Sequence, residues 1–270
     1  MQIDILTLFP EMFTGPFDAS IIKRAREKNL LSLELINIRD FSQNKHHTVD
    51  DTPYGGGAGM LMAAEPIFEA ADWLRSSRGG IGRFIYLSPA GDPLNQEMVK
   101  GFAAEKHIVL LCGHYEGVDQ RVRDELVTDE VSIGDYVLTG GELPAMVLVD
   151  AVIRLIPGVL GEMASAEEDS FSGGLLEYPH YTRPRVYRGM EVPEVLLNGH
   201  HEQIRLWRRR HSLLNTLARR PELLARAPLT DEDKVILKQA VIELEKLGLP
   251  EEIGKKPRKK NTGYRSQESE

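Results

Sequence analysis

The sequence has little of what secreted proteins, membrane proteins and zinc-stabilised folds need. Its single cysteine, Cys112, excludes an internal disulfide and a structural site of cysteines and zinc. No stretch approaches the roughly 20 consecutive apolar residues of a membrane helix. The first residues carry no basic segment ahead of an apolar run, so we expect no signal peptide. Together these absences favour a cytoplasmic protein without a membrane partner.

The common glycine patterns for nucleotide binding are also missing. Residues 50–60 are rich in glycine, but Met60 stands where a GxGxxG pattern beginning at Gly55 would need its last glycine. No P-loop lysine follows this segment. We therefore expect an irregular loop that forms no regular structure.

Acidic residues outnumber basic ones, 41 to 33, but the excess of positive charge is concentrated in one part of the chain. The formal net charge of −8 is unfavourable for binding nucleic acid. Residues 180–226 nevertheless hold ten Arg, no Lys and four Glu, an excess of six positive charges that leaves −14 for the remainder. This excess would attract an anionic partner, although a solvated helix surface is the more common reason for a charge run.

What the chain does contain is a βαβ rhythm. Its 270 residues, 41% of them hydrophobic, are enough for a large core. Apolar runs predict strands at residues 3–9, 33–38, 84–87, 108–112 and from 131, and helical spacing predicts helices at 20–29, 65–75, 118–126 and 143–156. This order favours an α/β fold with a parallel sheet.

Three loops rich in glycine or proline follow predicted strands. They span residues 88–91, 113–117 and 134–141. Loops at the carboxyl ends of parallel strands share one edge of the sheet, where their backbone groups can hold a ligand. Tyr115, Glu116, Ser132 and Tyr136 add polar and aromatic groups, so we expect a polar, partly aromatic ligand there. Taken singly, each glycine could serve only a tight turn.

The second half of the chain changes character after residue 156. The helix at 143–156 is apolar almost all round, which is typical of burial on several sides, with another subunit as one candidate neighbour. An acidic linker rich in Ser, Ala and Gly follows. Helices expected at 191–197, 203–219 and 231–247 predict a small all-α second domain, and a lysine-containing tail is expected to be disordered.

Six motifs together give the chain a family resemblance. They are Asp-Asp-Thr-Pro-Tyr-Gly-Gly-Gly from Asp50, Leu-Ser-Pro from Leu87, Cys-Gly-His-Tyr-Glu-Gly from Cys112, Ser-Ile-Gly-Asp-Tyr-Val-Leu-Thr-Gly-Gly-Glu from Ser132, Glu-Asp-Ser-Phe from Glu168 and His-Tyr-Thr-Arg-Pro from His180. In this order they resemble the bacterial tRNA (guanine-N1)-methyltransferase, from the first strand to about residue 247.

The resemblance implies a SPOUT-type α/β methyltransferase with a parallel sheet, a C-terminal trefoil knot in its catalytic domain and a small all-α C-terminal domain. General rules of chain topology alone would have rejected a knot. The implied domains are a knotted, S-adenosylmethionine-binding catalytic domain at 1–160, a linker with the catalytic Asp at 161–175 and a helical tRNA-binding domain at 176–250. The tail at 251–270 lies outside the resemblance, and its composition alone predicts disorder. A homodimer is also implied, with each active site shared between one subunit's knot and the other subunit's linker and C-terminal domain.

By the same resemblance, S-adenosylmethionine is held by the three loops already identified. The implied donor-binding residues are Tyr86, Leu87, Ser88, Pro89, Gly113, Tyr115, Glu116, Gly117, Ser132, Ile133, Gly134, Tyr136, Val137, Leu138, Gly140, Gly141 and Pro144. Magnesium dependence is associated with the family, but no carboxylate cluster in the sequence indicates a metal site.

The implied substrate is the guanosine immediately 3′ of the anticodon, position 37, methylated at N1. Because N1 carries a proton at neutral pH, a general base must remove it, and the charge that develops at O6 needs a cation or donor. The resemblance gives the base role to Asp169 and the charge-stabilising role to Arg154. Without the resemblance, the sequence favours a solvated linker acid for Asp169 and an ion pair with Asp150 for Arg154. Candidate RNA contacts are Arg183, Arg185, Arg208 and Arg209.

Two other functions remain open on the sequence. A related knotted methyltransferase acting on ribose or ribosomal RNA would need no base for a ring proton, and the Asp169 motif speaks against it. A non-catalytic RNA-binding dimer would keep the knot only as a scaffold, but the methyl-donor loops read as intact.

Overall fold

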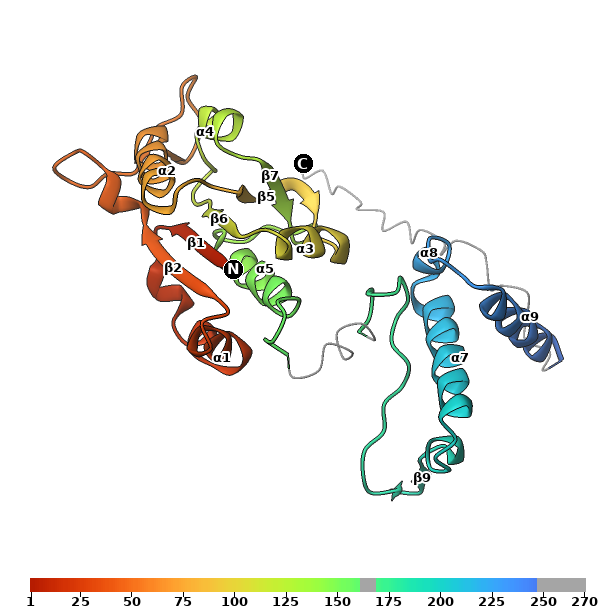
Figure 1. Ribbon diagram of the computed structural model, residues 1–270. Helices are drawn as coiled ribbons and strands as arrows, with labels where there is room; N and C mark the ends of the chain where they lie inside the picture. Colours follow the sequence, from red (N-terminus) through yellow and green to blue (C-terminus); the bar gives the residue numbers. More distant parts are fainter. Residues whose placement is uncertain (161–168, 247–270) are drawn as a thin grey trace, which may run out of the picture. The chain divides into compact units, whose positions relative to one another are not determined.

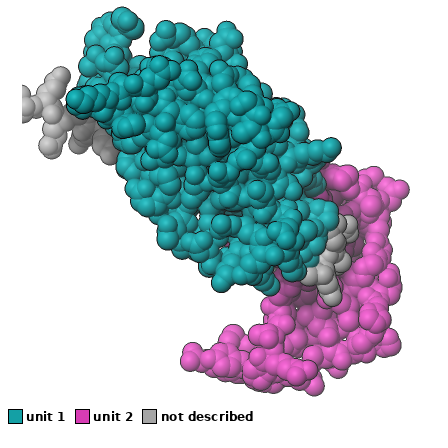
Figure 2. All heavy atoms as spheres, turned by 60° about the vertical axis from the view of Figure 1, so that its left-hand side comes forward, with its two compact units in different colours: residues 1–167 teal, residues 168–270 magenta. Residues whose placement is uncertain are grey.

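The computed structural model describes residues 1–160 and 169–246 (Figure 1). The chain divides into two compact units, residues 1–167 and 168–270, which Figure 2 colours separately. Most of the predicted linker and the whole predicted tail lie outside the described residues.

A five-stranded parallel sheet forms the centre of the first unit. Its order is β2-β1-β6-β5-β7, and every neighbouring pair is parallel. The strands are β1 (Gln2–Thr7), β2 (Ser32–Asn37), β5 (Arg83–Pro93), β6 (His107–Cys112) and β7 (Asp129–Ser132). This pairing confirms the predicted parallel sheet. Because both of its faces are covered, its central strands can consist almost wholly of apolar residues.

Helices cover both faces of this sheet (Figure 1). One hydrophobic cluster combines Ile5 and Leu110 with α1 (Ser20–Glu27), α3 (Gln96–Ala103) and α5 (Glu142–Ile153). The other combines Leu6 and Leu111 with α2 (Ala64–Arg78) and α4 (Gln120–Glu125). Successive strand residues point to opposite faces, so each strand contributes to both clusters.

For two segments of this unit the sequence predicted a turn or an irregular loop, and this was wrong because both contain paired strand residues. The turn predicted at residues 88–91 lies inside β5: Leu87 and Asp92 both pair with Val131, and the residues between them bulge out of the ladder. The ends of the glycine-rich loop are regular, because β3 (Asp50–Asp51) pairs with β4 (Leu61–Met62) as an antiparallel ladder.

Helix α3 was missing from the sequence prediction, although its start has a clear signal. The Asn95 side chain accepts hydrogen bonds from the backbone N–H groups of Glu97 (3.0 Å) and Met98 (3.1 Å), which caps the helix. Three-residue and four-residue 3₁₀ turns at Pro10–Phe13, Pro16–Asp18 and Ile38–Phe41 complete the described elements of the unit.

The second unit consists mainly of helices with one small hairpin. Its elements are β8 (Val186–Tyr187), β9 (Met190–Glu191), the 3₁₀ turn η4 (Glu194–Leu196), α7 (His201–Arg219), α8 (Pro221–Leu224) and α9 (Asp231–Lys246). The helix predicted at 191–197 is replaced by β9 and η4. Pro193 explains this difference, since the residue before a proline is driven out of the helical region.

Candidate active site

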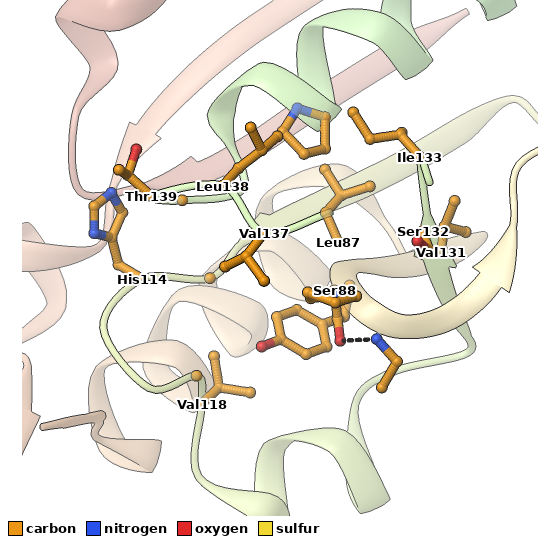
Figure 3. A pocket seen from close by; sticks show the side chains of 18 of the residues that line it. Leu87, Ser88, His114, Val118, Val131, Ser132, Ile133, Val137, Leu138 and Thr139 are labelled. Atoms are coloured by element: carbon orange, nitrogen blue, oxygen red, sulfur yellow. Dashed lines mark hydrogen bonds between the residues drawn. The ribbon is translucent and has the colours of Figure 1, made fainter. Parts of the chain in front are cut away.

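A pocket of about 410 Å³ lies at the carboxyl ends of β5, β6 and β7. Every residue predicted to bind the methyl donor lines it, so the structure brings the three predicted loops together. Figure 3 shows side chains from these separate segments gathered around one space, with Leu87, Val118 and Leu138 among them.

The loops are tied to one another by main-chain hydrogen bonds. The Gly141 N–H donates to the Gly113 carbonyl (2.9 Å), and residues 114 and 140 form an antiparallel bridge. The β3–β4 hairpin supports the loop after β6, because the Met62 N–H donates to the Gly117 carbonyl (2.9 Å). The pocket walls are thus set largely by backbone, which loops rich in glycine permit.

Glycine is needed at several of these positions because other groups already occupy the space. A Cβ on Gly141 would lie 2.6 Å from the Cα of Cys112, which is backbone and cannot move aside. A Cβ on Gly113 would lie 2.9 Å from the ring of Tyr86. Gly134 has a φ of +144°, a conformation that residues with side chains rarely adopt.

The side chains around the pocket combine apolar and ionisable groups. Tyr136 is 55% exposed and Val137 85% exposed, so apolar and aromatic surface is available to a ligand. Burial, with a smaller contribution from Glu130, raises the pKa of Tyr86 and keeps its phenol protonated at neutral pH. Arg123 donates to both carboxylate oxygens of Glu130, at 3.1 and 2.9 Å.

Six further residues line the pocket but are not among the predicted donor-binding residues. They are Ala90, His114, Val118, Arg123, Val131 and Thr139. His114 and Thr139 lie inside motifs already quoted, so their neighbours were a usable signal. Arg123 comes from α4, and no sequence pattern places a residue of that helix beside the strand ends.

The two predicted catalytic residues belong to different compact units. Arg154 is half-buried at the C-cap of α5 in the first unit. Asp169 is half-buried in the second unit, where its carbonyl accepts the Ser172 N–H at 3.2 Å.

The four predicted RNA-binding arginines have different surroundings. Arg183 and Arg185 are exposed in the segment before β8. The guanidinium of Arg208 lies over the Tyr178 ring, 4.9 Å from its centroid. Arg209 is held by Asp233 of α9, with Nε–Oδ1 and Nη2–Oδ2 distances of 2.7 Å. This contact and hydrogen bonds from Thr230 lower the pKa of Asp233 to about 2.

Within the described ranges, 1–160 and 169–246, no group of three or more His, Cys, Asp and Glu is placed to hold a metal ion. The magnesium dependence implied by the resemblance therefore gains no support from those residues. The helices of the same ranges include none long and apolar enough for a bilayer.

Comparisons with known proteins agree on one family. The family model for tRNA (guanine-1)-methyltransferase TrmD matches residues 1–226. A tRNA (guanine-N(1)-)-methyltransferase of Desulforamulus reducens is 68% identical over 238 residues, which cover 88% of this chain and 94% of that protein. One of Pelotomaculum thermopropionicum is 64% identical over 92% of this chain and 100% of its own. The crystal structure of the tRNA (m1G37) methyltransferase from Aquifex aeolicus superposes with a TM-score of 0.68, at 40% identity, over 84% of this chain and 95% of that one.

Proposed function

This chain belongs to the tRNA (guanine-1)-methyltransferase family, and we propose that it binds its methyl donor, S-adenosylmethionine, in the pocket at the ends of β5, β6 and β7. The protein is an enzyme that methylates N1 of guanosine in tRNA. One observation carries the proposed donor site: all the residues expected from the three motif loops meet in a single pocket.

The residues present suit such a donor. The pocket volume of about 410 Å³ is within the range of small-molecule sites, roughly 300–1,000 Å³. Loop main chain offers hydrogen bonds to polar edges of an adenosine, and Leu87, Ile133 and Leu138 offer apolar surface to its ring. When bound, S-adenosylmethionine supplies an electrophilic methyl group on a sulfonium.

We propose that Asp169 and Arg154 act on the guanine. The Asp169 carboxylate accepts the proton of N1, which frees the ring nitrogen's electron pair for attack on the methyl group. Electron density moves toward O6 as that proton leaves, and the Arg154 guanidinium stabilises it. The guanosine immediately 3′ of the anticodon, position 37, is the proposed target.

The knot is also a proposal, supported by the path of the chain after β7. β7 lies at the edge of the sheet, yet the next residues return across the ends of the inner strands. Residue 140 bridges His114 after β6, and Glu142 reaches Thr7 at the end of β1, where it accepts a hydrogen bond of 2.7 Å. A knot requires the chain to pass back over strands that come earlier in the sequence, and the chain after β7 follows such a path.

We propose a homodimer that uses α5 as a contact. Leu143 and Val147, one turn apart on this helix, are 47% and 48% exposed although most other α5 residues are buried. A second subunit would remove this apolar surface from water. In the proposed dimer, the second unit of one protomer binds tRNA through Arg183, Arg185 and Arg208 and presents Asp169 to the partner's donor pocket. The tRNA substrate implies a cytoplasmic reaction.

The direct test is to incubate the purified protein with labelled S-adenosylmethionine and unmodified tRNA, then map the methylated nucleoside. We expect 1-methylguanosine immediately 3′ of the anticodon. A label on a ribose hydroxyl, or no transfer despite donor and tRNA binding, would support one of the two alternative functions.

The base role has its own test in single-turnover kinetics. We expect Asp169→Asn to keep donor affinity but to slow methyl transfer by roughly 10²- to 10⁴-fold, because an amide cannot accept the N1 proton as a carboxylate does. Asp231→Asn, an exposed acid of the same unit, is the control for loss of charge. A loss below about threefold at saturating donor and tRNA would assign the base to another residue.

A further inference from the structure

A buried polar cluster lies directly behind the donor pocket. Glu142, at the start of α5, is 0% exposed, and its Oε1 accepts a hydrogen bond of 2.7 Å from the Thr7 hydroxyl of β1, which is also 0% exposed. Its Oε2 lies 3.5 Å from Nε2 of His114 in the loop after β6. The cluster therefore joins the end of a central strand, the start of a helix and a pocket loop.

The geometry around Glu142 leaves one interaction incomplete. Its Oε2 is buried and makes no hydrogen bond to the described residues, although the imidazole of His114 is near it. A buried carboxylate oxygen without a donor is costly. A small movement of His114 toward Glu142 would complete the bond, and His114 is itself a lining residue of the pocket.

The approach of Glu142 to His114 lies where two neighbouring pocket loops meet. Gly140 packs against the two facing groups, since a Cβ there would overlap Oε2 of Glu142 and Nε2 of His114. The His114–Gly140 bridge and the Gly141-to-Gly113 hydrogen bond hold the same two loops together on the main chain. Glu142 thus stands where the two loops meet, and Thr7 fixes the carboxylate from the rigid sheet.

We propose that Thr7 and Glu142 are positioning residues for the methyl donor: they clamp His114 and the loop of Gly140 at the separation that the donor needs. The proposal rests on the proposed function, because it assumes that the pocket binds S-adenosylmethionine. Thr7 does not line the pocket, so its effect on the donor is transmitted through Glu142 and the loops.

Thr7 offers a matched pair of substitutions. Thr7→Val keeps the shape of the side chain but removes the hydroxyl, which donates to Glu142 and accepts the Phe9 N–H (3.0 Å), whereas Thr7→Ser keeps the hydroxyl. By calorimetry at a temperature well below unfolding, we expect Thr7→Val to raise the donor Kd roughly 10- to 150-fold, the scale of losing the hydrogen bond to the buried carboxylate. Thr7→Ser should restore an affinity within about threefold of the wild type.

Asp4 supplies the control for simple destabilisation. It is a buried polar residue of the same strand, and it also contacts a histidine, with 2.8 Å between its Oδ2 and Nε2 of His107. It lies in the amino-terminal half of β1 and does not line the pocket. Asp4→Asn should lower the thermal midpoint without changing donor affinity.

Kinetics separate a clamp from a structural role. A clamp raises the KM for the donor in Thr7→Val while the KM for tRNA, and kcat at saturating donor, stay within about twofold. Glu142→Gln is the second probe if Thr7→Val folds poorly, because the amide keeps the size and an acceptor for Thr7 but removes the charge facing His114. It too should raise the donor Kd.

Two results would overturn the proposal. If the wild type binds donor but the Thr7 and Glu142 variants bind it equally well, the cluster only stabilises the fold. If the wild type itself does not bind S-adenosylmethionine, the proposed donor site fails first and the clamp fails with it.

Discussion

The contact between Arg209 and Asp233 allows a prediction that separates folding from RNA binding. Arg209 is one of the predicted tRNA contacts, and its guanidinium also forms two parallel hydrogen bonds with a carboxylate that is 1% exposed. Asp233 also accepts the Thr230 N–H at 2.8 Å at the start of α9. We therefore expect Arg209 to hold α7 and α9 together.

The magnitude follows from the pKa of Asp233. A carboxyl whose pKa falls from 3.8 to about 2 on folding stabilises the folded state by about 2 kcal/mol at neutral pH, since one pKa unit corresponds to about 1.36 kcal/mol. Because the pKa is lower in the folded state, this stabilisation is present above pH 4 or so and is lost as the pH falls through about 2. Roughly half of it should remain at pH 3.

The perturbation is a double-mutant cycle of Arg209→Met and Asp233→Asn. Methionine keeps an apolar stem in place of the arginine, and asparagine keeps the shape of the aspartate. We expect a coupling energy of about 2 kcal/mol at pH 7 that declines toward pH 3. Arg209→Met alone should be the most damaging change, because it leaves a buried carboxylate without its cation.

The assay is urea unfolding of the full chain followed by tryptophan fluorescence. The sequence has two tryptophans, Trp73 in α2 and Trp207 in α7, so a Trp73→Phe background reports on the second unit. Trp207 stacks on His211 with ring centroids 3.9 Å apart, which makes its emission sensitive to the order of α7. A coupling energy below about 0.5 kcal/mol at pH 7, or one that does not change between pH 7 and 3, would show that the Arg209–Asp233 pair does not hold α7 and α9 together.

Two other predictions concern the ligands. Gly134→Val should weaken S-adenosylmethionine binding more than tenfold in calorimetry, because the new Cβ would lie 2.7 Å from the Tyr136 ring at a φ of +144°; Gly101→Ala in α3, where the space is open, is the control and should leave the affinity unchanged. Arg208→Gln should weaken tRNA binding and lower the logarithmic salt slope by roughly 0.7 to 0.9 without unfolding the second unit, whereas Arg75→Gln on α2 should do neither. If truncation after residue 248 removes the slope and Arg208→Gln does not, the lysine-rich tail is the electrostatic contact.

Much of the pocket at the carboxyl ends of β5, β6 and β7 was predictable because its parts are local in sequence. Apolar runs followed at once by glycines identify the carboxyl ends of parallel strands, and such ends meet at one edge of the sheet. The positions of Gly113, Gly134 and Gly141 in the pocket follow from this rule together with the motifs. Local signals therefore identified the loops, while the ligand proposed for them came from the family resemblance.

What the sequence could not provide depends on contacts between distant segments. The bulge in β5 exists because both Leu87 and Asp92 pair with Val131 of another strand, which no property of residues 88–91 specifies. The pairing of Arg209 with Asp233 could not be predicted for the same reason. The run of arginines on α7 is the same in the sequence whether acidic residues of α9 or RNA phosphates neutralise it. Charge counts describe a segment, whereas binding depends on the charge left after packing.

The strand order also has a consequence for synthesis on the ribosome. β2 follows β1 closely in the chain and can pair with it early, whereas the other edge of β1 pairs with β6, which begins about 70 residues after β2 ends. During that interval a nascent chain presents an unpaired edge with Ile3 and Ile5, the kind of edge that recruits other chains. Asp4 stands between them, and a charge on an open edge discourages such pairing. In the folded protein, Nε2 of His107 in β6 lies 2.8 Å from the Asp4 carboxylate. The strand that pairs with this edge of β1 therefore also supplies a hydrogen-bonding partner for Asp4.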